Sequence, residues 1–145
     1  MTNSEVICRK RPDLKMIAIV KSLMRFYGFK TRDVSWPLLV YQGNDGLASY
    51  HEGYIDLGYL STEEDLVHEL VHHYQADQTP PVYRSLTDHQ RLIAWTKDPR
   101  EYGARFIALV YTRPDLTVEE IRLLIDQENK AICNGDLSVV KTDHQ

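Results

Sequence analysis

The clearest helical period of apolar residues in the chain begins after Ser61 and is followed by Pro80-Pro81. At about 100° per residue these side chains form one continuous arc, which is typical of a helix packed against a core. The four residues Ser-Thr-Glu-Glu at its start have the form of a capping box, with Ser61 as the N-cap and Glu64 reaching back to its backbone N–H. We expect the helix to end near Thr79, because the two prolines cannot continue it. The arc consists of Leu66, Val67, Leu70, Val71 and Tyr74.

Four more segments combine a helical period with start or stop residues. The first is closed by Gly28, a typical residue just after a helix end. Further along, Thr87 and Asp98 suit N-cap positions, and Pro99 suits the first helical position. Thr117-Val118-Glu119-Glu120 is a second capping box. These helices are expected at residues 13–27, 87–95, 99–113 and 117–132.

Two extended runs lie between the first of these helices and the one that begins after Ser61. Residues 36–42 and 47–60 predict two strands, and the Gly-Asn-Asp-Gly cluster at 43–46 predicts a β-hairpin between them. In the second run apolar and polar residues alternate, so one face packs inward. This run could lie buried in the middle of the sheet, or at an edge where an extended peptide could pair with its main chain. The inward-facing positions are Ile55, Leu57 and Tyr59.

Together these patterns predict an α+β domain in which helices pack on a small sheet. A chain of 145 residues can bury a sizeable core, and we expect residues 1–145 to form a single domain with loose ends at 1–12 and 139–145. Cys8 and Cys133 lie near opposite ends of the chain and lack metal-type spacing. We therefore expect reduced structural thiols, with one bridge between the two cysteines as the alternative.

The charge pattern narrows the expected partners. The formal net charge is −4 and the sequence pI is about 5.8, with no basic stripe. We therefore expect neither nucleic acid nor an anionic membrane surface as a partner. The N-terminal residues lack an apolar signal core, and no run approaches the length of a membrane span, so a cytoplasmic protein is expected.

The helix after Ser61 carries the pattern His68-Glu69-x-x-His72. Two histidines four residues apart lie one turn above each other, so both imidazoles can reach one metal ion. Glu69 can hold a water on that metal. Both histidines fall on the edge of the apolar arc, so we expect their side chains to lie at the rim of a cleft. The pattern is typical of a zinc hydrolase, and a polar helix face with surface histidines is the alternative.

A catalytic zinc usually takes three protein ligands and keeps a fourth position for water, so a third ligand is expected elsewhere. Glu101 is the best candidate, because it begins a separate apolar helix that can pack against the histidine helix. Glu101 could instead complete a capping box with Asp98, three residues before it, and Asp98 is the reserve ligand. His73 points about 100° away from the other histidines and is not expected to bind the metal. The candidates considered are His73, Asp77, Asp88, His89, Asp98 and Glu101.

At these residues the chain resembles the gluzincin branch of the zincin-like metallopeptidases. The likeness is to the small minigluzincin-type domains in particular, and more distantly to the ImmA/IrrE-like peptidases. The matching pieces are the strand that ends in Ile55-Asp56-Leu57, segment 66–75 with its His-Glu-x-x-His pattern, and segment 100–108, which begins Arg-Glu-Tyr-Gly-Ala. They cover roughly half of the chain.

The resemblance implies a zincin-like fold with a small, mostly antiparallel sheet whose edge lines the cleft. It also implies His68, His72 and Glu101 as zinc ligands and Glu69 as the general base. The expected activity is hydrolysis of a peptide or protein substrate by a metal-activated water. The rival is a non-catalytic zinc-binding regulatory or interaction protein with the same fold. Residues that could stabilise the oxyanion are His51, His89, Tyr102 and Tyr111.

Overall fold

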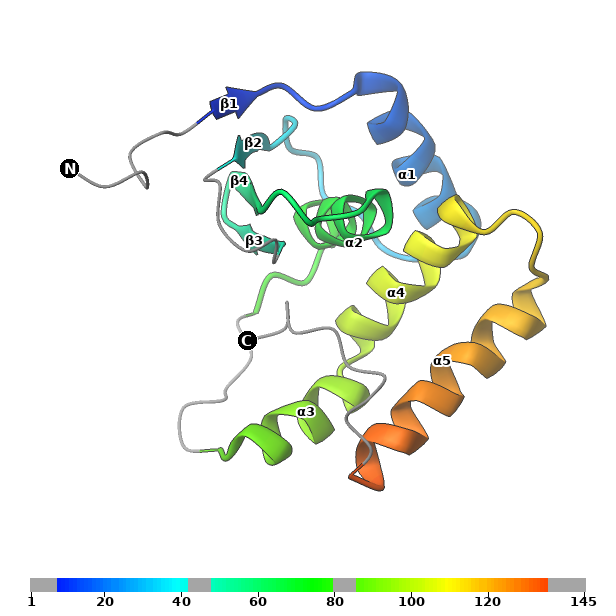
Figure 1. Ribbon diagram of the computed structural model, residues 1–145. Coiled ribbons are helices and arrows are strands. Elements are labelled where there is room, and N and C mark those ends of the chain that lie inside the picture. The colour runs from blue at the N-terminus through cyan, green and yellow to red at the C-terminus, as the bar shows by residue number, and fades with distance from the viewer. Residues whose placement is uncertain (1–7, 42–47, 80–85, 136–145) are drawn as a thin grey trace.

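The computed structural model describes residues 8–41, 48–79 and 86–135, and this part of the chain forms four short strands and five helices (Figure 1). The predicted α+β class is therefore confirmed. The strands are β1 (Cys8–Lys10), β2 (Leu38–Tyr41), β3 (Ser49–His51) and β4 (Tyr54–Leu57). The helices are α1 (Leu14–Phe26), α2 (Glu63–Tyr74), α3 (Asp88–Lys97), α4 (Pro99–Thr112) and α5 (Val118–Cys133).

Helix α2 lies at the centre of the molecule (Figure 1). It packs against β3 and β4 on one side and against α1 and α4 on the other. Helix α5 covers α4, and α3 packs against both. The apolar arc predicted for α2 is buried: Val67, Leu70, Val71 and Tyr74 are at most 1% exposed. Burial of this arc on several neighbours fixes the direction of every polar side chain on α2.

The sheet is small and mixed, with the order β1-β2-β4-β3. Strands β1 and β2 are antiparallel, β2 and β4 are parallel, and β3 and β4 are antiparallel. The predicted hairpin between the two extended runs is therefore wrong. Residues 47–60 instead contain a hairpin of their own, because Glu52-Gly53 turns the chain between β3 and β4. Gly53 has φ +87°, a conformation that side chains other than glycine rarely adopt.

Strand β4 lies inside the sheet, between β2 and β3. Its predicted inward face is confirmed at Ile55 and Leu57, which are 0% and 3% exposed. It is wrong at Tyr59, which is 68% exposed because the strand ends at Leu57. Because both edges of β4 are paired, its main chain is not open to an extended peptide. In the sheet as described, the edge strand next to β4 is β3.

Four helices have the start or stop residues that the sequence predicts. In α1 the prediction concerns only Gly28, which follows the helix with φ +82°; the N-cap, which was not predicted, is Asp13, which accepts from the Lys15 N–H. Pro99 takes the first position of α4 after Asp98. The hydroxyls of Thr87 and Thr117 complete capping boxes with Gln90 and Glu120 in α3 and α5.

Both ends of α2 differ from the prediction. The N-cap is Thr62 rather than Ser61, and the capping box is completed by Asp65 rather than Glu64. The helix ends at Tyr74 rather than near Thr79, because the chain leaves it to pair with the segment after α1. The Arg32 N–H donates to the Tyr74 carbonyl at 2.9 Å, and the Ala76 N–H to the Lys30 carbonyl at 3.1 Å.

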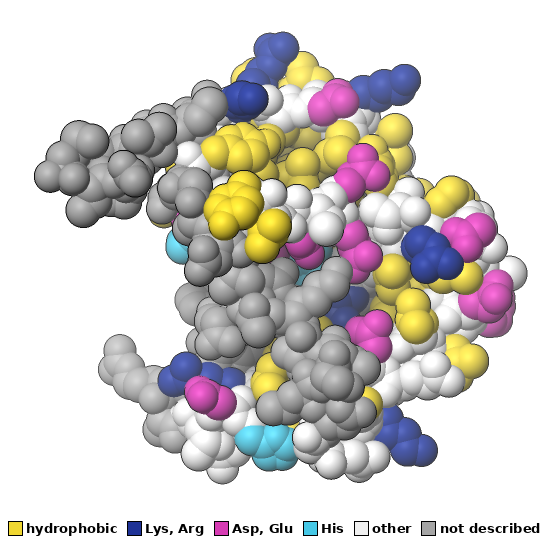
Figure 2. All heavy atoms as spheres, viewed as in Figure 1, with side chains coloured by type: hydrophobic (Ala, Val, Ile, Leu, Met, Phe, Trp, Pro, Cys, Tyr) yellow, Lys and Arg dark blue, Asp and Glu magenta, His cyan; other side chains and the backbone are white. Residues whose placement is uncertain are grey.

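The turn predicted at residues 43–46 falls outside the described residues, as do residues 1–7 and 139–145 of the predicted loose ends and the Cys8 side chain. The prediction of a loose N-terminal end over residues 1–12 is wrong for residues 8–10, which form β1 and pair with β2. Cys133 carries a free, exposed thiol. Among the described residues, no helix is both long and apolar enough to cross a membrane. On the face in Figure 2, Lys and Arg side chains are scattered among Asp and Glu rather than gathered in one stripe.

The capping box of α2 gives a first prediction. Thr62→Ala removes the oxygen that accepts from the Asp65 N–H, so it should lower the free energy of unfolding of the metal-free protein by about 1 kcal/mol. Urea denaturation measures this change. Thr62→Ser is the matched control, because serine keeps the hydroxyl and should retain most of the stability. Equal stability of Thr62→Ala and the wild type would contradict the corrected helix start.

Candidate metal centre

Three ligand atoms from two helices converge on one point. His68 and His72 come from α2, and Glu101 comes from the first turn of α4. The His68 Nε2 and His72 Nε2 atoms are 3.2 Å apart, and each is 3.0 Å from Glu101 Oε1. The three side chains are 9%, 14% and 19% exposed. The cluster is therefore largely buried but retains access to solvent.

The close approach of α4 to α2 lets Glu101 reach the histidines. Small buried residues follow it in α4: Gly103, Ala104 and Ala108. A Cβ on Gly103 would lie only 3.0 Å from Phe29 Cε1, so this position has little room for a side chain. The sequence places a carboxylate at the start of α4 and small residues where the helix enters the core.

Asp98 and Glu101 have different surroundings, although both carboxylates lie at the start of α4. The Asp98 carboxylate accepts from the backbone N–H and the guanidinium of Arg100, at 2.9 to 3.3 Å. The Asp98 N–H donates to the Trp95 carbonyl. Glu101 turns its carboxylate towards His68 and His72 instead of completing a capping box with Asp98. The reserve candidate is thus a cap and ion-pair residue in this structure.

The hydrogen bonds of His72 define which ring nitrogen carries its proton. The Gln75 amide nitrogen donates to the Arg100 carbonyl at 2.8 Å, so Gln75 Oε1 is the atom that faces His72 Nδ1, also at 2.8 Å. Because Oε1 only accepts, Nδ1 must be protonated. In neutral His72 the Nε2 lone pair then points at Glu101 Oε1, so an acceptor faces an acceptor. Either a second proton on His72 or a bound cation relieves this contact.

The electrostatics of the metal-free cluster favour the second proton. Burial lowers the pKa of His72, but the hydrogen bond to Glu101 and the charges of Glu101 and Glu69 outweigh it and raise the pKa to about 9. Burial raises the pKa of Glu101, but hydrogen bonds from His68 and His72 outweigh it and hold that pKa well below its usual range. The Glu101 carboxylate therefore stays ionised, and its negative charge favours a proton or a cation at His72 Nε2.

The donor atoms fit a zinc ion. Imidazole nitrogens and carboxylate oxygens are common zinc ligands, and tetrahedral bonds of 2.0 to 2.1 Å place the ligand atoms about 3.3 Å apart. The three separations in this cluster are 3.0, 3.0 and 3.2 Å. A triangle of this size can bind one zinc ion with little movement of the backbone.

Glu69 is buried beside the cluster and is 5% exposed. One of its carboxylate oxygens lies within 4.8 Å of a ligand nitrogen of His68 and of His72. Within the described residues these three side chains form a group that could hold a metal. Glu69 follows His68 on the helix, so its carboxylate comes to the cluster from a different direction than the two imidazoles.

His73 points away from the metal cluster, as its position in the sequence predicts. Its Nε2 donates to the Ser35 carbonyl at 2.7 Å, and its Nδ1 accepts from the Tyr50 hydroxyl at 3.0 Å. Arg32 donates to the His73 carbonyl and to the Tyr50 hydroxyl. Burial, with the charge of Arg32 acting in the same direction, lowers the pKa of His73. His73 is thus a buried neutral side chain that anchors α2 to β3 and to the segment after α1.

The other ligand candidates do not join the cluster. Asp77, Asp88 and His89 are exposed on the surface, and the Asp77 carboxylate accepts from the Thr79 N–H at 2.9 Å. His51, one of the oxyanion candidates, is also exposed and stacks on Tyr54. Gln75, which the sequence did not single out, does contact the cluster through His72, and its amide nitrogen also donates to the Arg100 carbonyl. The only feature of the sequence that could have indicated this role is the spacing, because Gln75 is an amide residue three positions after His72.

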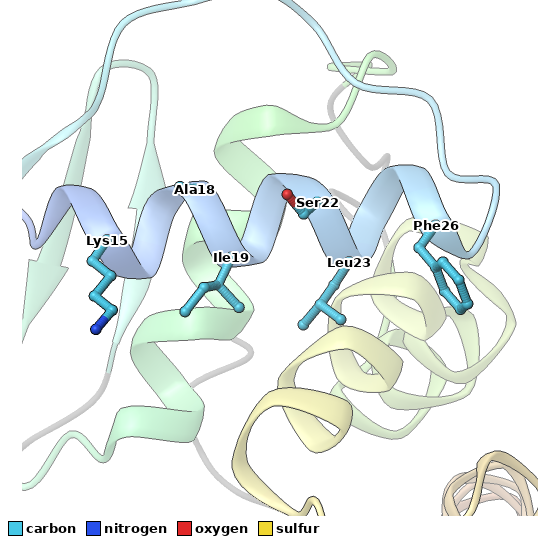
Figure 3. Close-up of a pocket in the computed structure, with 6 residues that line it drawn as sticks. All are labelled: Lys15, Ala18, Ile19, Ser22, Leu23 and Phe26. Carbon is cyan, nitrogen blue, oxygen red and sulfur yellow. The ribbon is translucent and has the colours of Figure 1, made fainter.

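A separate apolar groove of about 440 Å³ runs along α1 (Figure 3). The side chains of Lys15, Ile19, Leu23 and Phe26 point to the same side of the helix. Phe26 is 79% exposed. This groove shares no residue with the metal cluster.

No family model, curated protein or solved structure matches this chain. The site is therefore described from its own geometry, which combines an imidazole pair on one helix with a carboxylate from a second helix. Side chains of these kinds could hold a metal ion.

The positions of Glu101 and Asp98 give a second prediction. Glu101→Gln should weaken zinc binding at least about tenfold, because a neutral amide is a poor ligand for a dication. Asp98→Asn should bind zinc like the wild type, because asparagine still caps α4 and the Asp98 carboxylate is bonded to Arg100. Zinc titration against a competing chelator measures both. The reverse result would move the third ligand to Asp98.

Proposed function

We propose that this protein is a zinc-dependent metallopeptidase of the zincin type, similar in plan to the small gluzincins. The observation that supports it is the triangle of His68 Nε2, His72 Nε2 and Glu101 Oε1, with edges of 3.0 to 3.2 Å. Helix α2 carries the motif between the sheet and the helix that supplies the third ligand, which suits this class of site.

His68, His72 and Glu101 would hold the metal, and three protein ligands leave one position for water or substrate. Zinc in this place would supply a Lewis acid for the scissile carbonyl and a water whose pKa is lowered towards about 7. The proton of His72 stays on Nδ1, which donates to Gln75 Oε1, so Nε2 is the nitrogen available to the metal. Because the pKa of His72 is raised in the metal-free cluster, zinc would compete with a proton for Nε2.

Glu69 is the proposed general base. Its carboxylate takes a proton from the attacking water and passes it to the leaving amine, so no covalent intermediate with the protein is required. Its burial beside His68 and His72, with one carboxylate oxygen within 4.8 Å of a nitrogen of each ring, supports this role. Helix α2 carries both the base and two of the ligands, so their relative positions are fixed by one element.

The proposed substrate is a peptide or protein in an extended conformation. Strand β3 packs against α2 and lies at one edge of the described sheet. The main chain of an edge strand can pair with an extended peptide. Within residues 47–60, the strand that could pair with an extended substrate is therefore Ser49–His51 rather than Tyr54–Leu57. The scattered Lys and Arg side chains in Figure 2 lend no support to a nucleic-acid substrate.

The third prediction is metal stoichiometry. The wild-type protein, purified without chelators and supplied with zinc, should contain about one zinc per chain and lose it to chelators. His72→Ala should lose most of this zinc, because it removes one of three ligands. Elemental analysis of the desalted protein measures both values. Wild-type protein without metal after reconstitution would contradict the proposed function.

The fourth prediction separates catalysis from metal binding at Glu69. Glu69→Gln should keep zinc affinity and fold nearly intact, but it should lower the rate of peptide hydrolysis by about 100-fold or more, because an amide cannot take a proton from water. The assay compares cleavage of a peptide library by the two zinc-loaded proteins. Equal cleavage rates would show that Glu69 is not the base.

The same assay distinguishes the rival function. A wild-type protein that binds one zinc but cleaves no member of a broad peptide library would support a non-catalytic zinc-binding module. Cleavage by the wild type that is lost in Glu69→Gln would support the enzyme.

A further inference from the structure

We propose that Gln75 is a positioning residue of the metal centre. Its amide fixes which ring nitrogen of His72 carries a proton, and it ties the helix of His72 to the helix of Glu101. The inference rests on the proposed function, since it takes the three ligand atoms as a zinc site. Gln75 is only 7% exposed, and both polar atoms of its amide are bonded inside the fold.

The backbone holds Gln75 in a defined place. Gln75 is the C-cap of α2, and its N–H donates to the Val71 carbonyl at 2.9 Å. The Gln78 amide nitrogen donates to the carbonyls of both His72 and Gln75, each at 2.7 Å. These bonds satisfy carbonyl groups at the end of α2. The Gln75 side chain therefore starts from a fixed point next to the last turn of the helix.

The amide of Gln75 has one orientation. The Arg100 carbonyl accepts, so the Gln75 atom 2.8 Å from it must be the amide nitrogen. The amide oxygen then lies 2.8 Å from His72 Nδ1, which must donate to it. A histidine that donates from Nδ1 presents Nε2 to a metal, and such a bond also orients the ring and raises the basicity of the ligand.

The second effect of Gln75 is on the spacing of the ligands. Arg100 directly precedes Glu101, so the bond to the Arg100 carbonyl ties the backbone next to the third ligand to the end of α2. A Cβ on Gly103 would lie 3.6 Å from the Gln75 amide nitrogen. The Gln75 amide thus lies in ordinary van der Waals range of position 103 of α4. The Gln75 side chain thus contacts both His72 and the backbone of α4 next to Glu101.

Two substitutions separate these effects. Gln75→Glu keeps an oxygen that accepts from His72 Nδ1 but has no donor for the Arg100 carbonyl. Gln75→Met keeps an unbranched side chain of similar length and loses both bonds. The two variants therefore share the loss of the link to α4 and differ in the bond to His72.

The test compares the full-length wild type with both variants. Zinc dissociation constants are measured by competition with a chelator, and the urea midpoint of each metal-free protein is measured in parallel. Both variants should have a lower midpoint, because both lose the Arg100 bond. Gln75→Met should weaken zinc binding about 10- to 100-fold, whereas Gln75→Glu should weaken it by less than about tenfold.

A nuclear magnetic resonance signal reports the bond itself without reference to activity. In the zinc-loaded wild type and in Gln75→Glu, the Nδ1 proton of His72 should exchange slowly with solvent, because it is hydrogen-bonded in a buried site. In Gln75→Met the same proton should exchange faster and lose intensity.

Two results would overturn the inference while leaving the proposed function in place. If both variants weaken zinc binding equally, Gln75 acts only through helix packing. If Gln75→Met binds zinc like the wild type, Gln75 has no part in the centre. A wild-type protein that binds no zinc would contradict the proposed function itself, and this inference with it.

Discussion

The centre of this structure depends on a contact between two acceptor atoms that needs a proton or a cation between them. His72 Nε2 and Glu101 Oε1 lie 3.0 Å apart, while Nδ1, the other ring nitrogen, donates a hydrogen bond to Gln75 Oε1. The two acceptors stay together because α2 and α4 bury apolar side chains against each other, and each Å² of apolar surface removed from water contributes roughly 25 cal/mol. Hydrophobic packing thus holds these two polar atoms close together, although their contact is favourable only when a proton or a cation lies between them.

Local signals in the sequence predict a large part of this arrangement. The apolar period of α2 and the spacing of His68 and His72 act within two helical turns, so tertiary contacts change them little. The start of α4 is equally local, because Asp98-Pro99 suits the N-cap and the first helical position. Since Glu101 lies two residues after that proline, its place near the start of a buried helix follows from the same signal. Its role as a ligand stays a prediction.

The features that the sequence missed depend on contacts distant along the chain. Ser61 with Glu64 and Thr62 with Asp65 both have the spacing of a capping box, and only the packing of α2 selects the second pair. The parallel pairing of β2 with β4 skips β3, which lies between them in the sequence, and it has no local signature. Gln75 acquires its contacts because the chain leaves α2 to pair with Thr31.

Gly103 has a consequence for how related sequences can vary. A methyl group at this position would press on Phe29 at 3.0 Å and touch the Gln75 amide at 3.6 Å. The side chains at positions 29, 75 and 103 therefore pack in the same small region, although position 103 comes 74 positions after position 29 in the sequence. In a set of homologues we would expect these three positions to change together: a larger residue at 103 would accompany a smaller one at 29 or a shorter one at 75. Such covariation would mark the chains that share this contact between α2 and α4, even where the rest of the sequence has diverged.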